Sequence, residues 1–393
     1  MSTTDAPAPA PAAPPPYSMK NPYQAKRLDN IRLTGPESDK DTRHHAICLR
    51  GSGVTYEPGD ALGLIVNNCP ELVTDLVEAL GAKGDEMVPD KNKNPKPLAD
   101  ALREDYAITF IDKKFVEACV KKGASDLAPL LEAANADKLK AYLAGRDECS
   151  DYVDVLRAYP NVKFAPEEFI PLLRRMPPRL YSIASSLAAH PEEVHLTVAT
   201  VRYKIRDRLR KGVASTFLAE RWSGDQTAGV YIQSQQKHFS LPHDPNTAMI
   251  MVGPGTGIAP FRGFLAHRLT TGATGKHWLF FGERRSSQDF FYQEALQEVE
   301  KNGHVRLSLA WSRDVPGERT FVQHKMLEAG KEIWEWLDQG AEFFVCGDKT
   351  RMAADVDAAL HKIVQDHGGK TEDQAKEYVE AMKKGHRYKR DVY

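Results

Sequence analysis

Cysteine is scarce in this chain of 393 residues, and the few cysteines present lie far apart. The five positions are Cys48, Cys69, Cys119, Cys149 and Cys346. Their odd number and the lack of any CxxC pair argue against a disulfide framework, a zinc site or an iron–sulfur cluster carried by this chain. The histidines show no ligand spacing either, so we expect no bound metal.

A surplus of charge is also missing, because 53 Lys and Arg stand against 54 Asp and Glu, for a net charge of -1. There is thus no global basic bias toward nucleic acid or a membrane surface. Nothing reads as a signal peptide or as an apolar run long enough to span a membrane. We therefore expect a soluble, cytoplasmic protein with neither nucleic acid nor membrane among its partners.

The chain length predicts two domains or one large one, and the composition changes along it. Residues 1–16 are almost all Ala, Pro, Ser and Thr, which is typical of a disordered tail or tether. Residues 17–243 read as a first domain, because short alternating runs broken by glycine and proline predict an antiparallel β-barrel. Within it, residues from about 68 to 165 show helical spacing, at 70–80, 115–121 and 124–143, and predict a helical insert.

The most informative stretch of the first domain is RLYSIASS, residues 179–186, which follows two prolines. Alternation along a strand places Arg179 and Tyr181 on one face, opposite Leu180 and Ser182. A cation, an aromatic ring and hydroxyls are suited to a flavin nucleotide, although a plain strand would look the same. The later stretch 212–216, GVAST, offers free N–H groups to an anion at a helix start, or is an ordinary glycine turn.

Residues 244–393 read as a second domain that begins with an apolar strand at 248–252. A turn containing Gly255, Thr256 and Gly257 follows, and then a helix. This order predicts a cradle for dinucleotide phosphates, although the spacing is GxGxG rather than GxGxxG. Three further strand–loop–helix units predict a doubly wound parallel sheet.

Ligands in such sheets lie at the carboxyl ends of the strands. Ser312 and Arg313 fall at such an end and are candidates for binding a ribose 2′-phosphate; solvated surface arginines are the alternative. Near the C-terminus, Thr371 and Gln374 predict a capping box for a last helix. The terminal aromatic, Tyr393, indicates nothing by itself, since chain ends usually fray.

The motifs RLYSIASS, GVAST, GPGTGIAPFRGF, FFGERR, AWSRD, FVCGD and YKRDVY occur in that order. As an ordered set they resemble the ferredoxin–NADP reductase superfamily, and more narrowly the flavoprotein (alpha) components of NADPH-dependent assimilatory sulfite reductases. The resemblance runs from about residue 23 to 393 and includes the helical insert typical of diflavin reductases. It implies a barrel that binds FAD and an α/β domain that binds NADPH.

The resemblance also implies roles for individual residues. FAD contacts match Thr109, Arg179, Leu180, Tyr181, Ser182, Thr197, Val198, Ala199, Tyr203, Gly212, Val213, Ala214 and Ser215. NADPH contacts match Ser312, Arg313, Arg319, Thr320, Phe321, Val322, Gln323 and Asp355, although this sequence is one residue longer before Arg319. Ser182, Cys346 and Asp391 match a trio beside the nicotinamide and flavin, and Tyr393 matches an aromatic residue that stacks on the flavin.

One departure from the resemblance sets the expected electron path. Full-length relatives carry a flavodoxin-like FMN domain before the barrel, and only the Ala/Pro-rich stretch stands there in this sequence. We therefore expect electrons to leave FAD for an external one-electron acceptor, either a sulfite reductase haemoprotein or a separate flavodoxin or ferredoxin. The alternatives are a stand-alone ferredoxin or flavodoxin NADP reductase and a non-enzymatic FAD-binding docking module.

Overall fold

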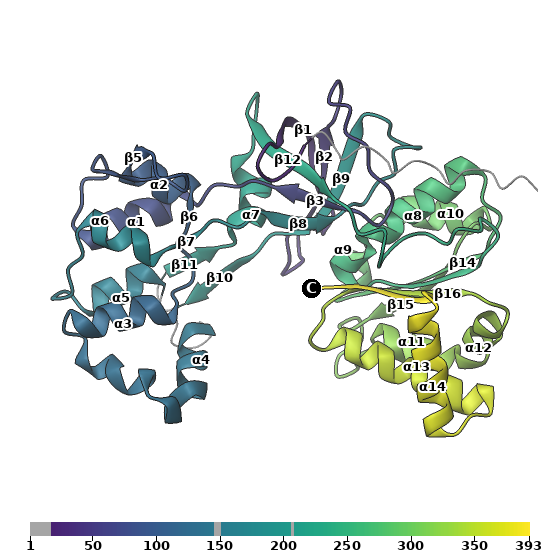
Figure 1. Ribbon diagram of the computed structural model, residues 1–393. Helices are drawn as coiled ribbons and strands as arrows, with labels where there is room; N and C mark the ends of the chain where they lie inside the picture. The colour runs from purple at the N-terminus through teal and green to yellow at the C-terminus, as the bar shows by residue number, and fades with distance from the viewer. Residues whose placement is uncertain (1–16, 145–150, 206–207) are drawn as a thin grey trace, which may run out of the picture.

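The computed structural model describes residues 17–144, 151–205 and 208–393. The predicted N-terminal tail and Cys149 lie outside these residues. Figure 1 shows, from left to right, a helical lobe, a barrel of strands and a second sheet covered by helices. No helix among the described residues is both long and apolar enough to cross a membrane.

The barrel is built from six strands in the order β8-β3-β12-β1-β2-β9, and each neighbouring pair is antiparallel. The strands are β1 (Tyr23–Arg32), β2 (Thr42–Cys48), β3 (Ala61–Leu64), β8 (Arg179–Ser182), β9 (Glu193–Ala199) and β12 (Thr227–Gln233). A bridge between Ile183 and Leu196 joins the two outer strands, and the Ala184 N–H donates to the His195 carbonyl at 2.8 Å. The sheet therefore closes, as the sequence predicts.

The helical lobe lies between β3 and β8 in the chain and has its own core. Its elements are α1 (Pro70–Leu80), β4 (Met87–Pro89), β5 (Pro95–Pro97), α2 (Leu98–Glu104), β6 (Tyr106–Ala107), α3 (Lys113–Lys121), η1 (Ser125–Leu131), η2 (Ala133–Asn135), α4 (Ala136–Ala144), α5 (Tyr152–Ala158), α6 (Pro166–Phe169), η3 (Ile170–Leu172) and β7 (Arg174–Arg175). The rings of Phe115, Tyr152 and Phe169 pack together with centroids 4.7–6.1 Å apart.

One predicted helix of this lobe is wrong in extent. The stretch 124–143 does not form a continuous helix, because short 3₁₀ turns precede α4. Pro129 lies inside the first of these turns and has no N–H to donate to a longer α-helix. The predicted helix at 70–80, by contrast, is α1 with the same bounds.

A hairpin and a short helix complete the barrel lobe. The hairpin consists of β10 (Arg202–Ile205) and β11 (Arg208–Lys211), and α7 (Val213–Thr216) follows it with Gly212 as its N-cap. A π-helical turn, η4 (Phe217–Arg221), extends α7. Arg208 and Arg210 form ion pairs with Asp151 and Asp154 of the helical lobe, so the hairpin and that lobe are held together.

The second sheet is parallel throughout, in the order β15-β14-β13-β16-β17. Its strands are β13 (Met249–Val252), β14 (His277–Glu283), β15 (Arg306–Trp311), β16 (Glu342–Gly347) and β17 (Tyr388–Val392). The helical elements are η5 (Gly255–Gly257), α8 (Ile258–Thr271), α9 (Ser286–Asp289), α10 (Gln293–Lys301), α11 (Val322–Glu328), α12 (Gly330–Asp338), α13 (Met352–Gly368) and α14 (Glu372–Lys384). The predicted doubly wound domain is confirmed.

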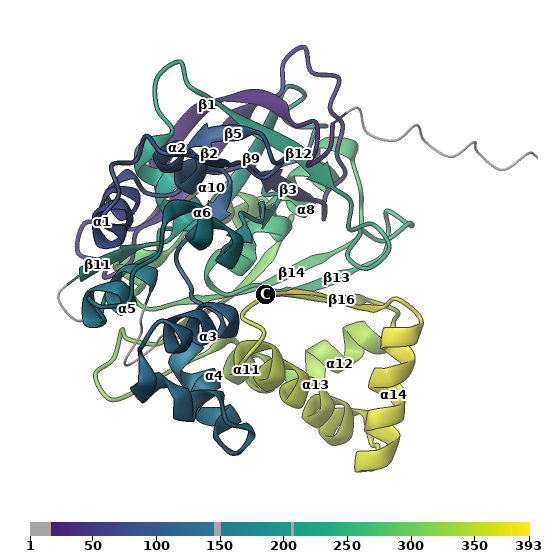
Figure 2. The same ribbon diagram turned by 60° about the vertical axis from the view of Figure 1, so that its left-hand side comes forward.

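Helices cover both faces of this sheet, which explains the unbroken apolar run of β13. Ile250 and Val252 pack in the core beneath α11 to α14, whereas Met249 and Met251 pack in the core that contains α8 and α10. Figures 1 and 2 both show α8 and α10 on the barrel side of the sheet and α11 to α14 on the other side. Thr371 and Gln374 form the predicted capping box at α14.

The C-terminal residues form a strand, which the sequence patterns do not predict. They form β17, which pairs with β16 along its length. Lys389, in the middle of this strand, is only 8% exposed, and its ammonium group meets Glu342 at 2.8 Å and the Ser240 carbonyl at 2.8 Å. Charged residues hid this strand from pattern analysis, because its buried lysine needs partners that come from elsewhere in the chain.

Three buried histidines in or beside the barrel make its stability depend on pH. Burial, with nearby cations, lowers the pKa of His44, His45 and His195 to about 3 each. An unfolded histidine titrates near pH 6.5, so between about pH 6.5 and 3 the unfolded chain binds protons that the folded chain does not. Stability therefore falls as the pH drops through this window.

We expect His45→Phe to flatten this dependence. Both ring nitrogens of His45 are buried without a hydrogen-bond partner, so the substitution removes one titrating group and no polar contact. The slope of unfolding free energy between pH 6 and 4 should fall by about 1.36 kcal/mol per pH unit, one proton's worth. Urea unfolding at several pH values measures it. The exposed His238→Phe variant should keep the wild-type slope, and an unchanged slope for His45→Phe would contradict the assignment.

Candidate functional site

The first candidate site is a cavity of about 270 Å³ beside β8 and the turn before α7. Residues from the barrel lobe and the helical lobe line it: Thr109, Phe110, Arg179, Tyr181, Ala199, Val201, Tyr203, Lys211, Gly212, Val213, Ala214 and Ser215. Most of the residues matched to FAD contacts therefore surround one space. The predicted alternation along β8 is also seen, because Arg179 and Tyr181 line the cavity while Leu180 does not.

Four matched positions lie outside this lining. Leu180 is 49% exposed, and Val198 is buried in the barrel core. Thr197 is buried as well, and its hydroxyl is 2.6 Å from that of Tyr292, in the second lobe. Ser182 instead faces the C-terminal strand. These residues shape the barrel or its contacts and are not brought to the cavity wall.

Close packing at Gly212 forms the floor of the cavity. A Cβ at this position would lie 2.6 Å from Ser215 Oγ and 2.9 Å from Val201 Cβ, so only glycine fits without movement of its neighbours. Ser215 Oγ accepts from the Val201 N–H at 3.0 Å, which ties the α7 turn to the preceding strand segment. The start of α7, from Gly212 to Ser215, therefore borders the cavity, and the first N–H groups of a helix have no partner within the helix.

The cavity has the features that an FAD site needs. Phe110, Val201 and Tyr203 expose 55%, 47% and 40% of their surface here, an unusual gathering of bare apolar side chains. Burial raises the pKa of the Tyr181 phenol, which keeps it neutral. Arg179 adds a cation, which suits a pyrophosphate. Residues that pack on rings, a cation and helix N–H groups together fit a flavin dinucleotide.

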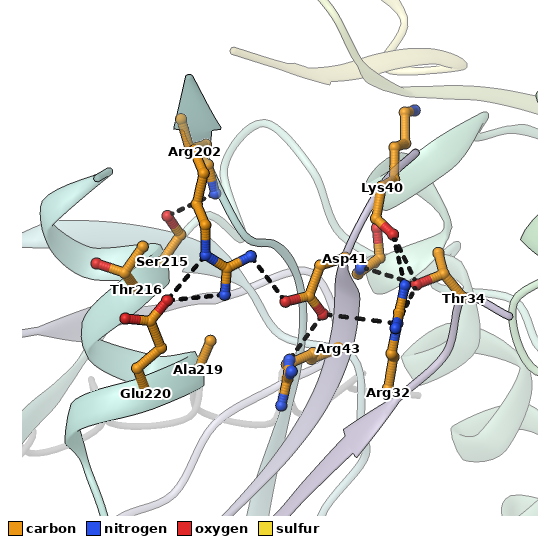
Figure 3. A network of polar contacts seen from close by, with 12 residues as sticks. Arg32, Thr34, Lys40, Asp41, Arg43, Arg202, Ser215, Thr216, Ala219 and Glu220 are labelled. Atoms are coloured by element: carbon orange, nitrogen blue, oxygen red, sulfur yellow. Dashed lines mark hydrogen bonds and ion pairs between the residues drawn. The ribbon is translucent and has the colours of Figure 1, made fainter. Parts of the chain in front are cut away.

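An ion-pair network holds the β10 side of this cavity in place. The Asp41 carboxylate accepts from Arg43 Nε at 2.7 Å and from Arg202 Nη1 at 3.0 Å, and Arg202 also pairs with Glu220 at 2.8 Å (Figure 3). Partial burial raises the pKa of Asp41, but hydrogen bonds from Arg43 and Arg202 outweigh it and the net shift is downward. The network positions Arg202 and hence the adjoining Tyr203.

The second candidate site is a cavity of about 390 Å³ at the carboxyl ends of β13, β14, β15 and β16. Eight residues predicted to contact the nucleotide line it: Gly255, Ser312, Arg319, Thr320, Phe321, Val322, Gln323 and Asp355. Gln323 Nε2 donates to Asp355 Oδ2 at 3.2 Å, which joins the two predicted segments. The structure thus collects residues from distant parts of the sequence at one edge of the sheet.

Three predicted nucleotide residues lie just outside this lining. Gly257 packs against β16, where a Cβ would lie 2.1 Å from the Cys346 carbonyl oxygen. Thr256 Oγ1 is 2.9 Å from the Tyr393 hydroxyl. Arg313 follows the lining residue Ser312, but its guanidinium donates to Asp39, from the β1–β2 loop, at 2.6 Å.

The trio Ser182, Cys346 and Asp391 is brought together where the two sheets meet. Ser182 Oγ donates to Asp391 Oδ2 at 2.5 Å, and Cys346 Sγ lies 3.8 Å from the same oxygen. Burial raises the pKa of the Cys346 thiol, and the Asp391 charge raises it further, so the thiol stays protonated and donates. The arrangement is a small donor–acceptor cluster rather than a thiolate nucleophile.

The last residue is fixed through its backbone and its hydroxyl. The Tyr393 N–H donates to the Gly347 carbonyl at 3.1 Å, and its own carbonyl accepts from Lys349 N–H at 3.1 Å. The side chain is 61% exposed and is held by Thr256. An exposed ring that a single side-chain hydrogen bond holds can change position at little cost.

The sequence missed several residues of the second cavity. Lys40 and Arg284 line it, and so does Arg351. The sequence carries a signal for Arg284, because this residue belongs to the FFGERR motif, for which no role is predicted above. The sequence carries no such signal for Lys40, because the β1–β2 loop precedes the glycine turn by more than 200 residues and contains no motif.

A group of potential ligands formed by His190, Glu193 and His195 was also missed, with ligand atoms within 4.8 Å of one another. His195 already uses both ring nitrogens, at 2.8 Å from Glu193 Oε2 and at 3.2 Å from Arg262 Nη1. The adjacent guanidinium opposes a cation, so we assign this group a structural role.

Comparison with known proteins matches both lobes. A family described as "FAD binding domain" matches residues 15–217, and one described as "Oxidoreductase NAD-binding domain" matches residues 251–358. The chain is 44% identical over 380 residues to the "Sulfite reductase [NADPH] flavoprotein alpha-component" of Bacillus subtilis (strain 168), covering 96% of this chain and 62% of that protein. The identically named protein of Aliivibrio fischeri is 44% identical over 378 residues, covering 96% and 61%. The chain therefore spans about three fifths of the length of these relatives.

Proposed function

Because the chain belongs to the FAD binding domain family and is an FAD- and NAD(P)-binding oxidoreductase of the sulfite reductase flavoprotein type, we propose that it passes electrons from NADPH through FAD to a separate sulfite reductase haemoprotein. In this proposal the chain works in the cytoplasm and meets its acceptor directly or through a separate flavodoxin. The non-enzymatic docking module considered from the sequence is set aside, because the chain is an oxidoreductase.

The observation that carries the proposal is the contact between Ser182 and Asp391. Ser182 ends β8, whose Arg179 and Tyr181 line the first cavity. Asp391 lies on β17, beside the strand that ends at the second cavity. A strand that lines the first cavity and a strand beside the second therefore meet at one hydrogen bond, which supports the proposal that two bound rings could lie close enough for electron transfer.

The chain's own residues have distinct parts in this function. FAD, when bound, supplies a ring that accepts a hydride and gives up electrons singly. Arg179 and the turn at Gly212 would hold its pyrophosphate, and Tyr181 would pack on its ring. Ser182 is placed to donate a hydrogen bond at the point of convergence, and Asp391 is placed to balance positive charge there. The Cys346 thiol keeps Asp391 oriented.

The nucleotide would be recognised through its phosphate groups. The turn from Gly253 to Gly257 precedes α8 and presents backbone N–H groups to a pyrophosphate. Ser312, Arg313 and Arg319 supply a hydroxyl and two guanidinium groups for the 2′-phosphate that distinguishes NADPH from NADH.

An acceptor screen tests the proposed function. With NADPH as donor, we expect the flavin-loaded chain to reduce a sulfite reductase haemoprotein, alone or with flavodoxin added, as followed by NADPH oxidation. Ferricyanide serves as the control that detects any reductase. Reduction of ferredoxin or flavodoxin without any transfer to the haemoprotein would show the alternative, a stand-alone reductase.

Arg313→Ala should raise the KM for NADPH by roughly tenfold or more and leave the KM for NADH nearly unchanged. The reason is the loss of a hydrogen bond to a charged group, about 1.5–3 kcal/mol. Steady-state kinetics with both nucleotides measures it, with ferricyanide as acceptor. Arg306→Ala, which changes an exposed arginine paired with Glu332, is the matched control. Equal effects on both nucleotides would reject the phosphate role of Arg313.

Deletion of Tyr393 should raise the use of NADH relative to NADPH. We propose that the ring covers the flavin and must move before the nicotinamide binds. Removal of this gate helps NADH more than NADPH, because NADH lacks the 2′-phosphate and so has less binding energy with which to displace the ring. The ratio of kcat/KM for the two nucleotides measures it. Tyr393→Phe keeps the ring and loses only the bond to Thr256, so it should stay near wild type. If the deletion leaves the ratio unchanged, the gate is wrong.

A further inference from the structure

The loop between β1 and β2, residues 33–41, leaves the barrel and lies on the second lobe. The Gly35 N–H donates to the Gln288 carbonyl at 2.7 Å, and the Glu37 N–H donates to Gln288 Oε1 at 3.1 Å. Ser38 forms a hydrogen bond with Asp289. These contacts attach residues 35–38 to α9 and do not involve Asp39 or Lys40, the two residues that follow.

Asp39, three residues before β2 begins, meets three arginines of the second lobe. Its Oδ2 accepts from Arg313 Nη1 at 2.6 Å and from Arg284 Nη1 at 2.9 Å, and Arg285 Nη1 lies 3.7 Å from Oδ1. Partial burial raises the pKa of Asp39, but Arg284, Arg313 and Arg285 lower it more, so the carboxylate is ionised. One anion from the barrel thus offsets part of the positive charge of the three arginines beside the second cavity.

Lys40, the next residue, enters the same cavity from the same loop. Its ammonium group pairs with Glu283, a carboxylate whose side chain is 4% exposed. Glu283 Oε1 would lie 3.2 Å from a Cβ on Gly255, so it stands against the phosphate turn. Figure 3 shows the Lys40 side chain pointing away from the Asp41 network. The loop therefore adds charges of both signs to the nucleotide site.

We propose that Asp39 is a specificity residue that occupies the arginines in place of the 2′-phosphate of NADPH and is exchanged for it on binding. This inference rests on the proposed function, because it needs Arg313 to meet that phosphate. A phosphate monoester carries more charge than a carboxylate and has three acceptor oxygens, so it pairs with several guanidinium groups at once.

The exposure of these groups makes the exchange feasible. The side chains of Asp39, Arg313 and Arg284 are 44%, 47% and 30% exposed, and ion pairs at such surfaces are weak. The contacts at Gln288 and Asp289 keep the loop attached while Asp39 lets go. NADH has no 2′-phosphate to displace the carboxylate, so with NADH the arginines stay paired with Asp39.

Asp39→Asn tests the exchange, because it removes the competing charge and keeps the shape. We expect titration calorimetry on the full flavin-loaded chain to show that 2′,5′-ADP binds three- to tenfold more tightly to this variant, with no change for 5′-ADP, which lacks the 2′-phosphate. The matched control is Asp225→Asn, an exposed aspartate paired with Lys26 at 2.8 Å in the barrel; it should bind both ligands as the wild type does.

Two results would overturn the inference. One is unchanged or weaker binding of 2′,5′-ADP by Asp39→Asn, since the acid would then not compete. The other is an equal increase in the affinity of Asp39→Asn for 5′-ADP, since the effect would then come from the change in overall charge and not from the 2′-phosphate. The Arg313→Ala variant distinguishes a failure of this inference from a failure of the proposed function. If the variant binds 2′,5′-ADP as tightly as the wild type does, Arg313 does not bind the 2′-phosphate and the proposed role itself is wrong. If Arg313→Ala weakens the binding of 2′,5′-ADP while Asp39→Asn leaves it unchanged, only the proposed exchange is wrong.

Discussion

The packing of α8 against the barrel is the constraint on which the rest of the molecule depends. A Cβ on Gly263 of α8 would lie 2.7 Å from the Ser185 carbonyl oxygen, so the helix and the strand backbone are nearly in contact. Arg262 donates to the Ala184 carbonyl at 2.6 Å and lies over the Tyr292 ring at 4.9 Å. Beside this joint the end of β8 reaches β17, where Ser182 donates a hydrogen bond to Asp391.

The two lobes also share charge. Polar groups that leave water need partners, and here the partner often comes from the other lobe. Lys40 from the barrel neutralises the buried Glu283, and Asp39 offsets part of the charge of the arginines around the nucleotide cavity. The nucleotide site is therefore a property of the pair of lobes, since the parallel sheet alone would leave Glu283 unpaired and the arginines in excess.

Much of both sites could be predicted from residue patterns. The Arg179–Ser182 strand, the Gly212 turn and the Gly255–Gly257 turn are local features, set by alternation, missing Cβ atoms and helix starts, so short stretches of sequence suffice to find them. The continuous helix at 124–143 failed because a proline inside the run outweighs its apolar spacing. The terminal strand was not predicted, because the partners that bury Lys389 are Glu342 and the Ser240 carbonyl, which lie 47 or more positions earlier.

The sequence by itself determined the two kinds of sheet, the motif turns and the class of ligands, because each depends on the order of neighbouring residues. Only the tertiary structure decided which groups face each other: Ser182 with Asp391 and Cys346, Tyr393 with Thr256, and Asp39 with Arg284 and Arg313. Those pairs are separated by as many as 274 positions. Charge attraction acts through space, so no spacing along the chain could reveal them.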